Sequence, residues 1–192
     1  MSKTVVLFGP PGCGKGTQAA RLKESLGVPH ISTGDMFRDH KARKTDLGTR
    51  VQEVLDRGEL VPDEITNAMV EERLGREDVA EGALLDGYPR NPDQARELDR
   101  VLAARGRAVD AVIVMEVPAE EVTRRLIERG KQSGRADDQD PATIRNRLEV
   151  YREQSEPCVA FYAEHHPQAV RRVDGVGTID AVTERILKSL NG

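Results

Sequence analysis

Residues 9–17 read Gly-Pro-Pro-Gly-Cys-Gly-Lys-Gly-Thr and directly follow the apolar run Thr4–Phe8. This order predicts a buried strand, a glycine-rich loop and then the start of a helix. Because glycines lack Cβ atoms, successive backbone N–H groups can turn inward and surround a polyphosphate, and the helix N-terminus adds unpaired donors. Lys15 can then reach the β- and γ-phosphates as a mobile positive charge. A turn with an incidental lysine would need neither the strand nor the helix, so we predict that the chain binds a nucleoside triphosphate.

The loop departs from the strict phosphate-loop pattern, in which Ser or Thr follows the lysine directly and contacts Mg²⁺. Here Gly16 intervenes, and the hydroxyl arrives one residue later on Thr17. In this respect the loop resembles that of adenylate kinases and their close nucleoside monophosphate kinase relatives. The departure at Gly16 argues against direct ligation of Mg²⁺ by a loop hydroxyl, and Thr17 is better assigned to the α-phosphate side of the donor.

The composition is that of an ordinary soluble globular enzyme with one core, since 38% of the 192 residues are hydrophobic and 32% are charged. The net charge of −4 gives no indication of binding to nucleic acid or to an anionic membrane surface. No stretch approaches the length of a membrane span, and the first expected strand leaves no room for a signal peptide. Cys13 and Cys158 form no CxxC or zinc-type cluster, so we expect a cytoplasmic protein. Cys13 is interpreted as a small residue whose backbone binds phosphate, with a redox-sensitive thiol as the alternative.

Apolar runs and helical patterns alternate along the chain. The runs that predict buried parallel strands are Thr4–Phe8, His30–Ser32, Ala83–Asp86, Ala111–Val117 and Ala169–Asp174. The helical stretches between and after them are Gly16–Leu26, Gly34–Asp56 with a break near Asp46–Gly48, Asp63–Leu74, Pro92–Arg105, Ala119–Arg129, Pro141–Glu164 and Ile179–Leu190. This alternation predicts an α/β fold with a doubly wound, five-stranded parallel sheet. Pro157 predicts a kink in the long helix that contains it.

Two segments depart from the simple alternation. Residues 33–82 supply several helices between the second and third strands in place of one crossover. Residues 130–140 are polar, contain two glycines and lack a hydrophobic anchor, so we expect them to form a flap or a solvated loop that does not pack as core. We further expect the glycines at 130 and 134 to act as hinges of such a flap.

Arginines gather near the predicted strand ends and the flap. They are Arg38, Arg90, Arg125, Arg129, Arg135 and Arg147. A single surface arginine is usually only solvated. However, Asp86–Arg90 and Ser32–Arg38 follow predicted strands at their carboxyl ends, where open α/β sheets bind ligands. Because a guanidinium group matches phosphate geometry, the pattern predicts a second anionic ligand opposite the triphosphate.

The ordered set of motifs resembles the adenylate kinase family over nearly the whole chain. These motifs are the phosphate loop, Ser32–Arg38, Gly58–Asp63, Leu85–Arg90 and Ser133–Asp138. The resemblance implies a single nucleotide-kinase domain, with a core of residues 1–31, 62–129 and 141–192. It also implies a helical NMP-binding insert at 32–61 and a short lid at 130–140. The short-lid members are typically monomers, which is the state we expect here.

The resemblance further implies roles for individual residues. ATP contacts are implied for Gly12, Cys13, Gly14, Lys15, Gly16, Thr17, Arg125, Arg129 and Gly177. AMP contacts are implied for Thr33, Arg38, Glu59, Leu60, Val61, Gly87, Tyr88, Pro89, Arg90, Gln94, Arg135 and Arg147. The residues expected to act on the transferred phosphoryl group are Lys15, Arg90, Arg129, Arg135 and Arg147.

The implied reaction is ATP + AMP ⇌ 2 ADP with Mg²⁺ as cofactor. A phosphate monoester with a second pKa of about 6 is already ionised at neutral pH, so the acceptor needs no general base. Asp86 is expected to hold Mg²⁺ through its water shell, although it could merely cap a turn. Residues 130–140 contain no cysteine or histidine, so we expect no structural zinc in the lid.

Two alternatives remain. A UMP/CMP kinase would share the scaffold, but those enzymes usually carry Ala and Asn where this chain has Thr33 and Gln94. The Gln94 amide can meet the adenine amino group and a ring nitrogen together, which favours AMP. A guanine nucleotide switch is the more distant alternative, because the chain has no Asn-Lys-x-Asp motif.

Overall fold

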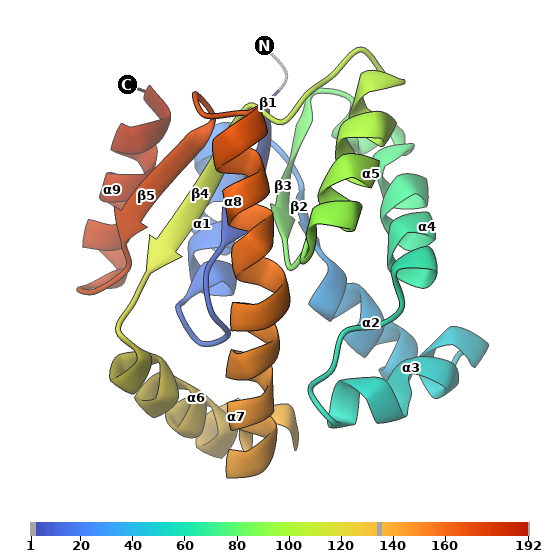
Figure 1. Ribbon diagram of the computed structural model, residues 1–192, viewed down its shortest axis with the longest axis vertical. Coiled ribbons are helices and arrows are strands. Elements are labelled where there is room, and N and C mark those ends of the chain that lie inside the picture. Colours follow the sequence, from blue (N-terminus) through green and yellow to red (C-terminus); the bar gives the residue numbers. More distant parts are fainter. Residues whose placement is uncertain (1–2, 134–135, 192) are drawn as a thin grey trace.

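The computed structural model describes residues 3–133 and 136–191. Its centre is a parallel sheet of five strands: β1 (Lys3–Phe8), β2 (His30–Ser32), β3 (Gly82–Asp86), β4 (Ala111–Glu116) and β5 (Val170–Asp174). The strand order is β2-β3-β1-β4-β5, and every neighbouring pair is parallel (Figure 1). The predicted doubly wound α/β fold is therefore confirmed.

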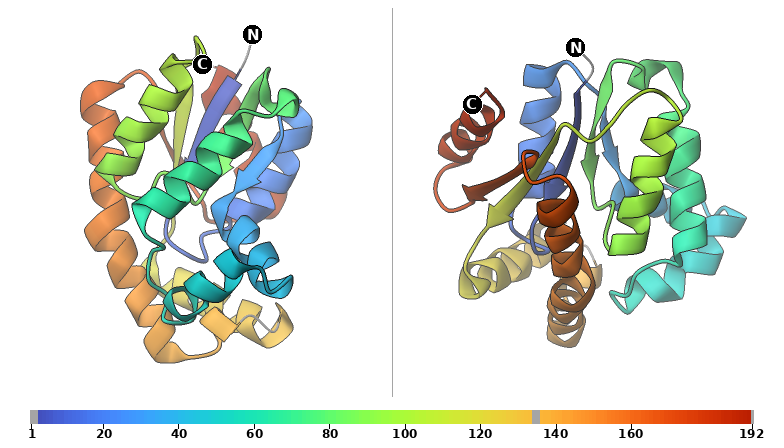
Figure 2. Two further views of the ribbon diagram at one scale, coloured as in Figure 1. Left: turned by 90° about the vertical axis from the view of Figure 1, so that its right-hand side faces the viewer. Right: turned by 45° about the horizontal axis from the view of Figure 1, so that its top comes forward.

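Helices cover both faces of this sheet because alternate strand residues are apolar on both sides. Val5 and Leu7 of β1 pack with α1 (Lys15–Leu26) and α9 (Ile179–Asn191). Val6 and Phe8 belong to the cluster on the opposite face. That face is covered by α4 (Asp63–Leu74), α5 (Pro92–Ala103) and α8 (Glu156–His165), as Figures 1 and 2 show. Each fully buried side chain of this size contributes about 1.5–3 kcal/mol, so the two layers fix the sheet firmly.

Two helices follow β2 and lie beyond the carboxyl end of the sheet, at the lower right of Figure 1: α2 (Thr33–Ala42) and α3 (Asp46–Asp56). The expected break near Asp46–Gly48 is present, because the Thr45 hydroxyl accepts from Gly48 N at 3.1 Å and caps α3. A Cβ at Gly48 would lie 2.2 Å from the His40 carbonyl oxygen, so only glycine lets the two helices cross this closely.

The segment after β4 consists of α6 (Ala119–Ser133), a 3₁₀ turn (η2, Ala136–Asp138) and α7 (Pro141–Val150). The helix expected to end at Arg129 thus runs on to Ser133 and includes Gly130. A Cβ at Gly130 would lie 2.3 Å from the Asp138 carbonyl oxygen, and Asp138 is only 2% exposed. The expectation that nothing in 130–140 packs is therefore wrong for Asp138. Gly130 permits this close contact with the 3₁₀ turn, and its role as a hinge stays a prediction. Gly134 lies outside the described residues.

The long helix expected from Pro141 to Glu164 is interrupted. Residues Tyr151–Ser155 form a π-helical turn (η3) that joins α7 to α8. Pro157 lies at the start of α8, where its ring removes a backbone donor and crowds the preceding turn. The predicted distortion is present as this wider turn, which precedes Pro157. A further 3₁₀ turn, η1 (Glu77–Val79), leads into β3. No helix among the described residues has the length and apolar character needed to cross a membrane.

Candidate active site

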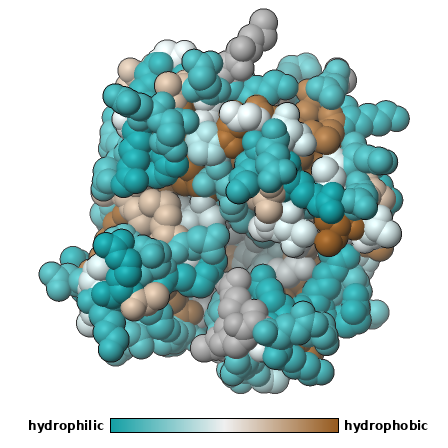
Figure 3. Space-filling view, turned by 180° about the vertical axis from the view of Figure 1, so that it is seen from behind, coloured by the Kyte–Doolittle hydropathy of each residue, from teal (hydrophilic) through white to brown (hydrophobic). Residues whose placement is uncertain are grey.

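The loops that follow β1 and β3 form the floor of a cavity of about 720 Å³. These two strands are neighbours in the sheet, yet the helices that follow them, α1 and α5, pack on opposite faces. Such a switch point opens a crevice at the carboxyl ends of the strands and is the usual ligand site of an open α/β sheet. Figure 3, the view from behind, shows a mainly hydrophilic surface with small scattered hydrophobic patches.

The glycine-rich loop runs directly into α1. Gly14 precedes the helix with φ +104°, a left-handed conformation that suits glycine, and no side chain caps the helix. The first N–H groups of the helix therefore lack intrahelical partners and remain available to an anion. A Cβ at Gly12 would lie 2.7 Å from Leu126 Cγ of α6, so this position requires glycine as well.

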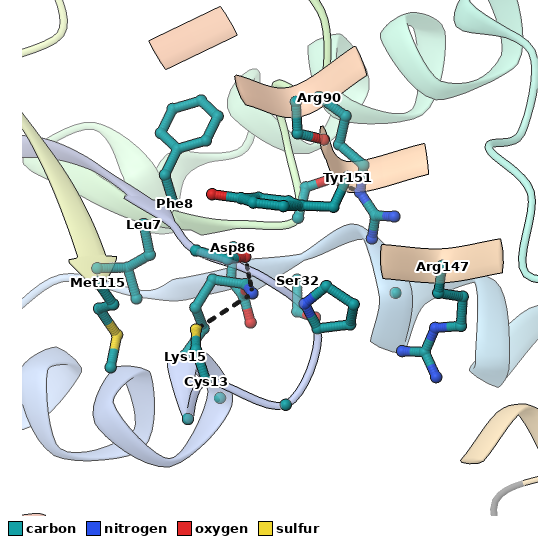
Figure 4. A pocket seen from close by; sticks show the side chains of 18 of the residues that line it. Leu7, Phe8, Cys13, Lys15, Ser32, Asp86, Arg90, Met115, Arg147 and Tyr151 are labelled. Atoms are coloured by element: carbon teal, nitrogen blue, oxygen red, sulfur yellow. Dashed lines mark hydrogen bonds between the residues drawn. The ribbon is translucent and has the colours of Figure 1, made fainter. Parts of the chain in front are cut away.

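Lys15 folds back over its own loop. Its Nζ donates to the carbonyl oxygens of Gly9 at 2.6 Å and Pro10 at 3.1 Å, and it lies 3.7 Å from Cys13 Sγ. Figure 4 shows the Lys15 amine beside the carboxylate of Asp86 at the end of β3. Carbonyl oxygens thus hold the ammonium group at the loop, where a phosphate would compete for the same donors.

Asp86 is an ionised carboxylate in the cavity wall. Burial tends to raise its pKa, but the neighbouring His30 and the charges of Lys15 and Arg90 outweigh burial and lower the pKa below the usual value. The His30 ring nitrogen lies 3.8 Å from Asp86 Oδ2, which is too far for a hydrogen bond, so we attribute its effect on the Asp86 pKa to electrostatic proximity. A negative oxygen pair facing a phosphate loop is suited to Mg²⁺ and its water shell.

On the other side of the cavity, the loop after β3 meets the start of α2. The Thr33 hydroxyl, 2% exposed, donates to the Gly87 carbonyl oxygen at 2.8 Å. The Arg90 Nε donates to the same carbonyl oxygen, also at 2.8 Å, and burial lowers the pKa of Arg90. These bonds hold Thr33 and Arg90 on the two sides of one carbonyl group and fix the shape of the loop.

The other predicted acceptor residues lie around the same end of the cavity. Arg38 bonds Asp35 at 2.5 Å, and although burial raises the pKa of Asp35, the hydrogen bond and charge of Arg38 lower it overall. The Arg57 guanidinium holds the Glu59 carboxylate at 2.8 and 3.1 Å, so the backbone of Glu59 is the part left for a ligand. Leu60 and Val61 line the cavity beside it.

Gln94 is only 1% exposed but lines the cavity. Its Oε1 accepts from Arg90 N at 2.8 Å, and its Nε2 donates to Asp63 Oδ1 at 2.7 Å. Asn91 Nδ2 donates to the same carboxylate at 3.1 and 3.0 Å. Asp63 therefore connects the first turn of α4 to the start of α5.

A third group of residues comes from α6 and α7. Arg129 and Arg147 share the carboxylate of Asp138, whose side chain is fully buried. The Arg129 contacts measure 2.5 and 2.9 Å, and Arg147 also contacts Asp137 at 2.9 Å. Figure 4 shows Arg147 and Arg90 along the same pocket as Lys15. Cationic side chains from separate segments, Lys15, Arg90, Arg129 and Arg147, thus line one cavity.

Arg125 links the phosphate loop to the connection between β5 and α9. Its guanidinium donates to Cys13 O at 3.2 Å and to Gly175 O at 3.3 Å, and Glu121 accepts from it at 2.7 Å. Hydrogen bonds from Arg124 and Arg125 lower the pKa of Glu121 to about 2. Gly177, with φ +124°, lies in the same β5–α9 connection and lines the cavity.

The predicted site residues are brought together with two qualifications. The cavity is lined by Gly12, Cys13, Gly14, Lys15, Gly16, Thr17, Thr33, Arg38, Glu59, Leu60, Val61, Asp86, Gly87, Pro89, Arg90, Gln94, Arg125, Arg129, Arg147 and Gly177. Tyr88 is different, because its side chain is 2% exposed and packs in the core, where its hydroxyl donates to Asn67 Oδ1 at 2.7 Å and to Gln94 O at 3.2 Å. Arg135 lies outside the described residues.

Sequence reasoning assigned no role to three residues that the structure brings to the site. Asp63 and Asp138 belong to motifs that the sequence analysis had recognised. Only Asp138 lies near a predicted arginine in the chain, whereas Asp63 and Gln94 are 31 residues apart. Tyr151 lines the cavity from the π-helical turn, and burial raises its pKa. Nothing in the sequence indicated this, because the turn itself was not predicted.

The described residues include no group of three or more His, Cys, Asp or Glu side chains placed to hold a metal ion. Asp86 is thus not part of such a group, and the His30 ring nitrogen lies 3.8 Å from its Oδ2. A hard cation here would keep most of its ligands from water and substrate, which is the usual arrangement for Mg²⁺ with phosphates.

Comparisons with known proteins agree with this geometry. The family model described as adenylate kinase matches residues 7–167. The chain is 50% identical to the adenylate kinase of Kocuria rhizophila over 186 residues, which cover 97% of each chain. It is also 50% identical to the adenylate kinase of Stenotrophomonas maltophilia over 188 residues, covering 98% of this chain and 99% of the relative. The same identity is found with the adenylate kinase of Thermobifida fusca over 186 residues, 97% of each chain.

Proposed function

Because this chain belongs to the adenylate kinase family, we propose that its cavity holds ATP and AMP together and transfers a phosphoryl group between them. The protein is a nucleoside monophosphate kinase, and the reaction is ATP + AMP ⇌ 2 ADP. The observation that carries the assignment of the two sites is their shared cavity. The phosphate loop, Thr33 and Gln94 all line it, and Figure 4 shows Arg90 and Arg147 along the same pocket as Lys15.

We assign the donor site to residues 12–17 together with Arg125, Arg129 and Gly177. The open N–H groups of α1 would bind the phosphates, and Lys15 would leave the carbonyl oxygens of Gly9 and Pro10 for the transferring group. Thr17 would lie on the α-phosphate side. Arg125 already contacts the loop and the β5–α9 connection, which supports a role in holding the donor between them.

We assign the acceptor site to residues 59–61 and 87–90 together with Thr33, Arg38 and Gln94. Arg38, Arg90 and Arg147 offer planar donors for the AMP phosphate. Tyr88 would act through the backbone, because its side chain packs in the core. Arg135 is assigned to the same phosphate group from the sequence alone.

The mechanism requires alignment and charge stabilisation more than proton transfer. The acceptor phosphate is ionised at neutral pH, so no side chain is needed as a general base. Lys15, Arg90, Arg129 and Arg147 would spread the charge that develops on the transferred group. Asp86 fits Mg²⁺ held through water, because its lowered pKa keeps it ionised beside the phosphate loop; Mg²⁺ would neutralise phosphate charge there.

The same assignment divides the chain into parts. We propose that residues 32–61, which include α2 and α3, form the acceptor-binding insert, and that residues 130–140 form the lid. Closure of these parts would exclude water, which competes with AMP as acceptor. We propose a monomer, as the resemblance to short-lid members implies, and a location in the cytoplasm, as the cysteine usage led us to expect.

An acceptor panel tests the proposal. Purified protein is assayed with Mg-ATP and with AMP, CMP, UMP or GMP, and ADP formation is followed. We expect kcat/KM to be highest with AMP and no ATP turnover without a monophosphate. A higher kcat/KM with UMP or CMP would contradict the acceptor assignment and favour a pyrimidine nucleotide kinase.

A further inference from the structure

The amide of Gln94 is held at both ends by groups that have only one hydrogen-bonding role. Arg90 N is a backbone donor and lies 2.8 Å from Gln94 Oε1. The Asp63 carboxylate is an acceptor and lies 2.7 Å from Gln94 Nε2. If the amide turned over, a donor would face a donor at Arg90 and an acceptor would face an acceptor at Asp63. These two contacts therefore select one orientation of the amide.

This orientation determines what the amide can offer to a base. Oε1 keeps a second lone pair and Nε2 keeps a second hydrogen, side by side in one plane. That pair complements a purine whose amino group donates next to a ring nitrogen that accepts. A purine with an oxo group at that position has the opposite pattern, because its oxygen accepts and its protonated ring nitrogen donates. The opposite pattern would require the amide to turn over.

We infer that Asp63 is a specificity-determining residue, which locks the Gln94 amide in the orientation that accepts a 6-aminopurine and rejects a 6-oxopurine. The inference rests on the proposed function, in which Gln94 reads the acceptor base. Asp63 does not line the cavity, so it is a positioning residue that acts through Gln94.

Asp63 is itself held in place. Asn91 Nδ2 donates to both of its oxygens, at 3.1 and 3.0 Å, and Asn91 also caps α5 by accepting from Gln94 N at 2.8 Å. The carboxylate therefore contacts both Asn91, which caps α5, and Gln94, the proposed base reader in the first turn of α5. A carboxylate that served only the N-terminus of α4 would not need these contacts to α5.

A purely structural role is the main alternative. Asp63 is an acidic residue in the first turn of α4, where negative charge stabilises a helix by about 0.3–1 kcal/mol. Glu64 occupies the same turn and is exposed. It provides a matched control, because Glu64→Ala removes the same kind of charge without touching Gln94.

The experiment measures kcat/KM for AMP and for inosine monophosphate, its 6-oxo counterpart, together with the KM for ATP. For Asp63→Ala we expect the preference for AMP over inosine monophosphate to fall about tenfold, the loss of one hydrogen bond to a charged group. The KM for ATP should stay within about twofold, because the donor end is not involved. Glu64→Ala should leave the preference unchanged.

Two further variants test whether the single hydrogen-bonding role of the carboxylate is what matters. Asp63→Asn can accept from Gln94 Nε2 or, turned over, donate to Gln94 Oε1, so it no longer selects the orientation at this end and should lose part of the preference. Asp63→Ser suits the first turn of a helix but has a shorter side chain, so it should lose the preference even if the alanine variant folds poorly. Equal preference in Asp63→Ala, Asp63→Ser and the unmodified protein would overturn the inference.

Gln94→Ala separates this inference from the function on which it rests. We expect Gln94→Ala to lose the preference by itself and Asp63→Ala to add nothing further in that background. If Gln94→Ala changes the preference and Asp63→Ala does not, Asp63 has no role in selection. If Gln94→Ala leaves the preference intact, the assignment of Gln94 as base reader fails, and the role of Asp63 fails with it.

Discussion

The buried carboxylate of Asp138 gives the most direct test of how the arginines are held. Its side chain is fully buried, and it contacts both Arg129 and Arg147, which come from α6 and α7. Asp138→Ala would leave two guanidinium groups facing one another with their shared acceptor removed. Breaking a buried ion pair in this way typically costs about 3–5 kcal/mol. Arg129 and Arg147 are 36% and 15% exposed and can regain water, so we expect the lower end, about 3 kcal/mol.

Thermal and urea unfolding measure this cost. For a domain of this size, a loss of 3 kcal/mol corresponds to a fall in Tm of about 6–12 °C. Asp180→Ala is the control, because Asp180 pairs with Arg21 on the surface, where both side chains are largely exposed, and should cost less than about 1 kcal/mol. If the two variants unfold at the same temperature, the reasoning about the buried carboxylate is wrong.

Four other predictions concern separate parts of the molecule. Lys15→Met should lower kcat by about 100-fold or more with little change in unfolding free energy, because it removes one electrostatic stabiliser of the transferring group; near-normal turnover would refute the loop assignment. Gln94→Ala should raise the KM for AMP by an amount equivalent to about 1–3 kcal/mol and spare the KM for ATP, and a change in the ATP value instead would mean that the two sites are interchanged. A bisubstrate nucleotide analogue should protect residues 130–140 from protease, and metal analysis should find no stoichiometric zinc; equal cleavage with and without the analogue would contradict the lid assignment. The pKa of Glu121 is lowered from the usual glutamate value of 4.5 to about 2. The unmodified protein should therefore be more stable than Glu121→Gln above pH 4.5, and this difference should be lost as the pH falls through about 2. Unfolding at a series of pH values can test this.

The features that the sequence predicted correctly are local in the chain. The phosphate loop depends on the order of strand, glycines, lysine and helix within 20 residues, and each part has a strong local preference. The sheet was predictable because its strands are short apolar runs separated by amphipathic helices. The break before α3 was also predictable, since Thr45 and Gly48 favour a helix start and a close crossing.

The features that were missed depend on contacts between distant segments. Asp63 and Gln94 are 31 residues apart, and only the packing of α4 beside α5 brings them together. Residues 130–140 look solvated by composition, yet Asp138 is buried because two arginines neutralise it and Gly130 leaves room for its backbone. Composition cannot distinguish a solvated carboxylate from one that is buried with its partners.

The small apolar cluster under α2 and α3 has a consequence for the motion of the acceptor site. Phe37, Val51 and Val61 form this cluster with Met69 of α4, apart from the clusters that cover the sheet. Met36 packs against both this cluster and the core cluster on one face of the sheet. Because this cluster is separate from those on the sheet, we expect α2 and α3 to open locally at a lower free energy than global unfolding. The unbranched methionines at the junction can repack as this happens. Amide hydrogens in α2 and α3 would then exchange early, and AMP in the acceptor site proposed above should slow their exchange while exchange in the sheet stays unchanged.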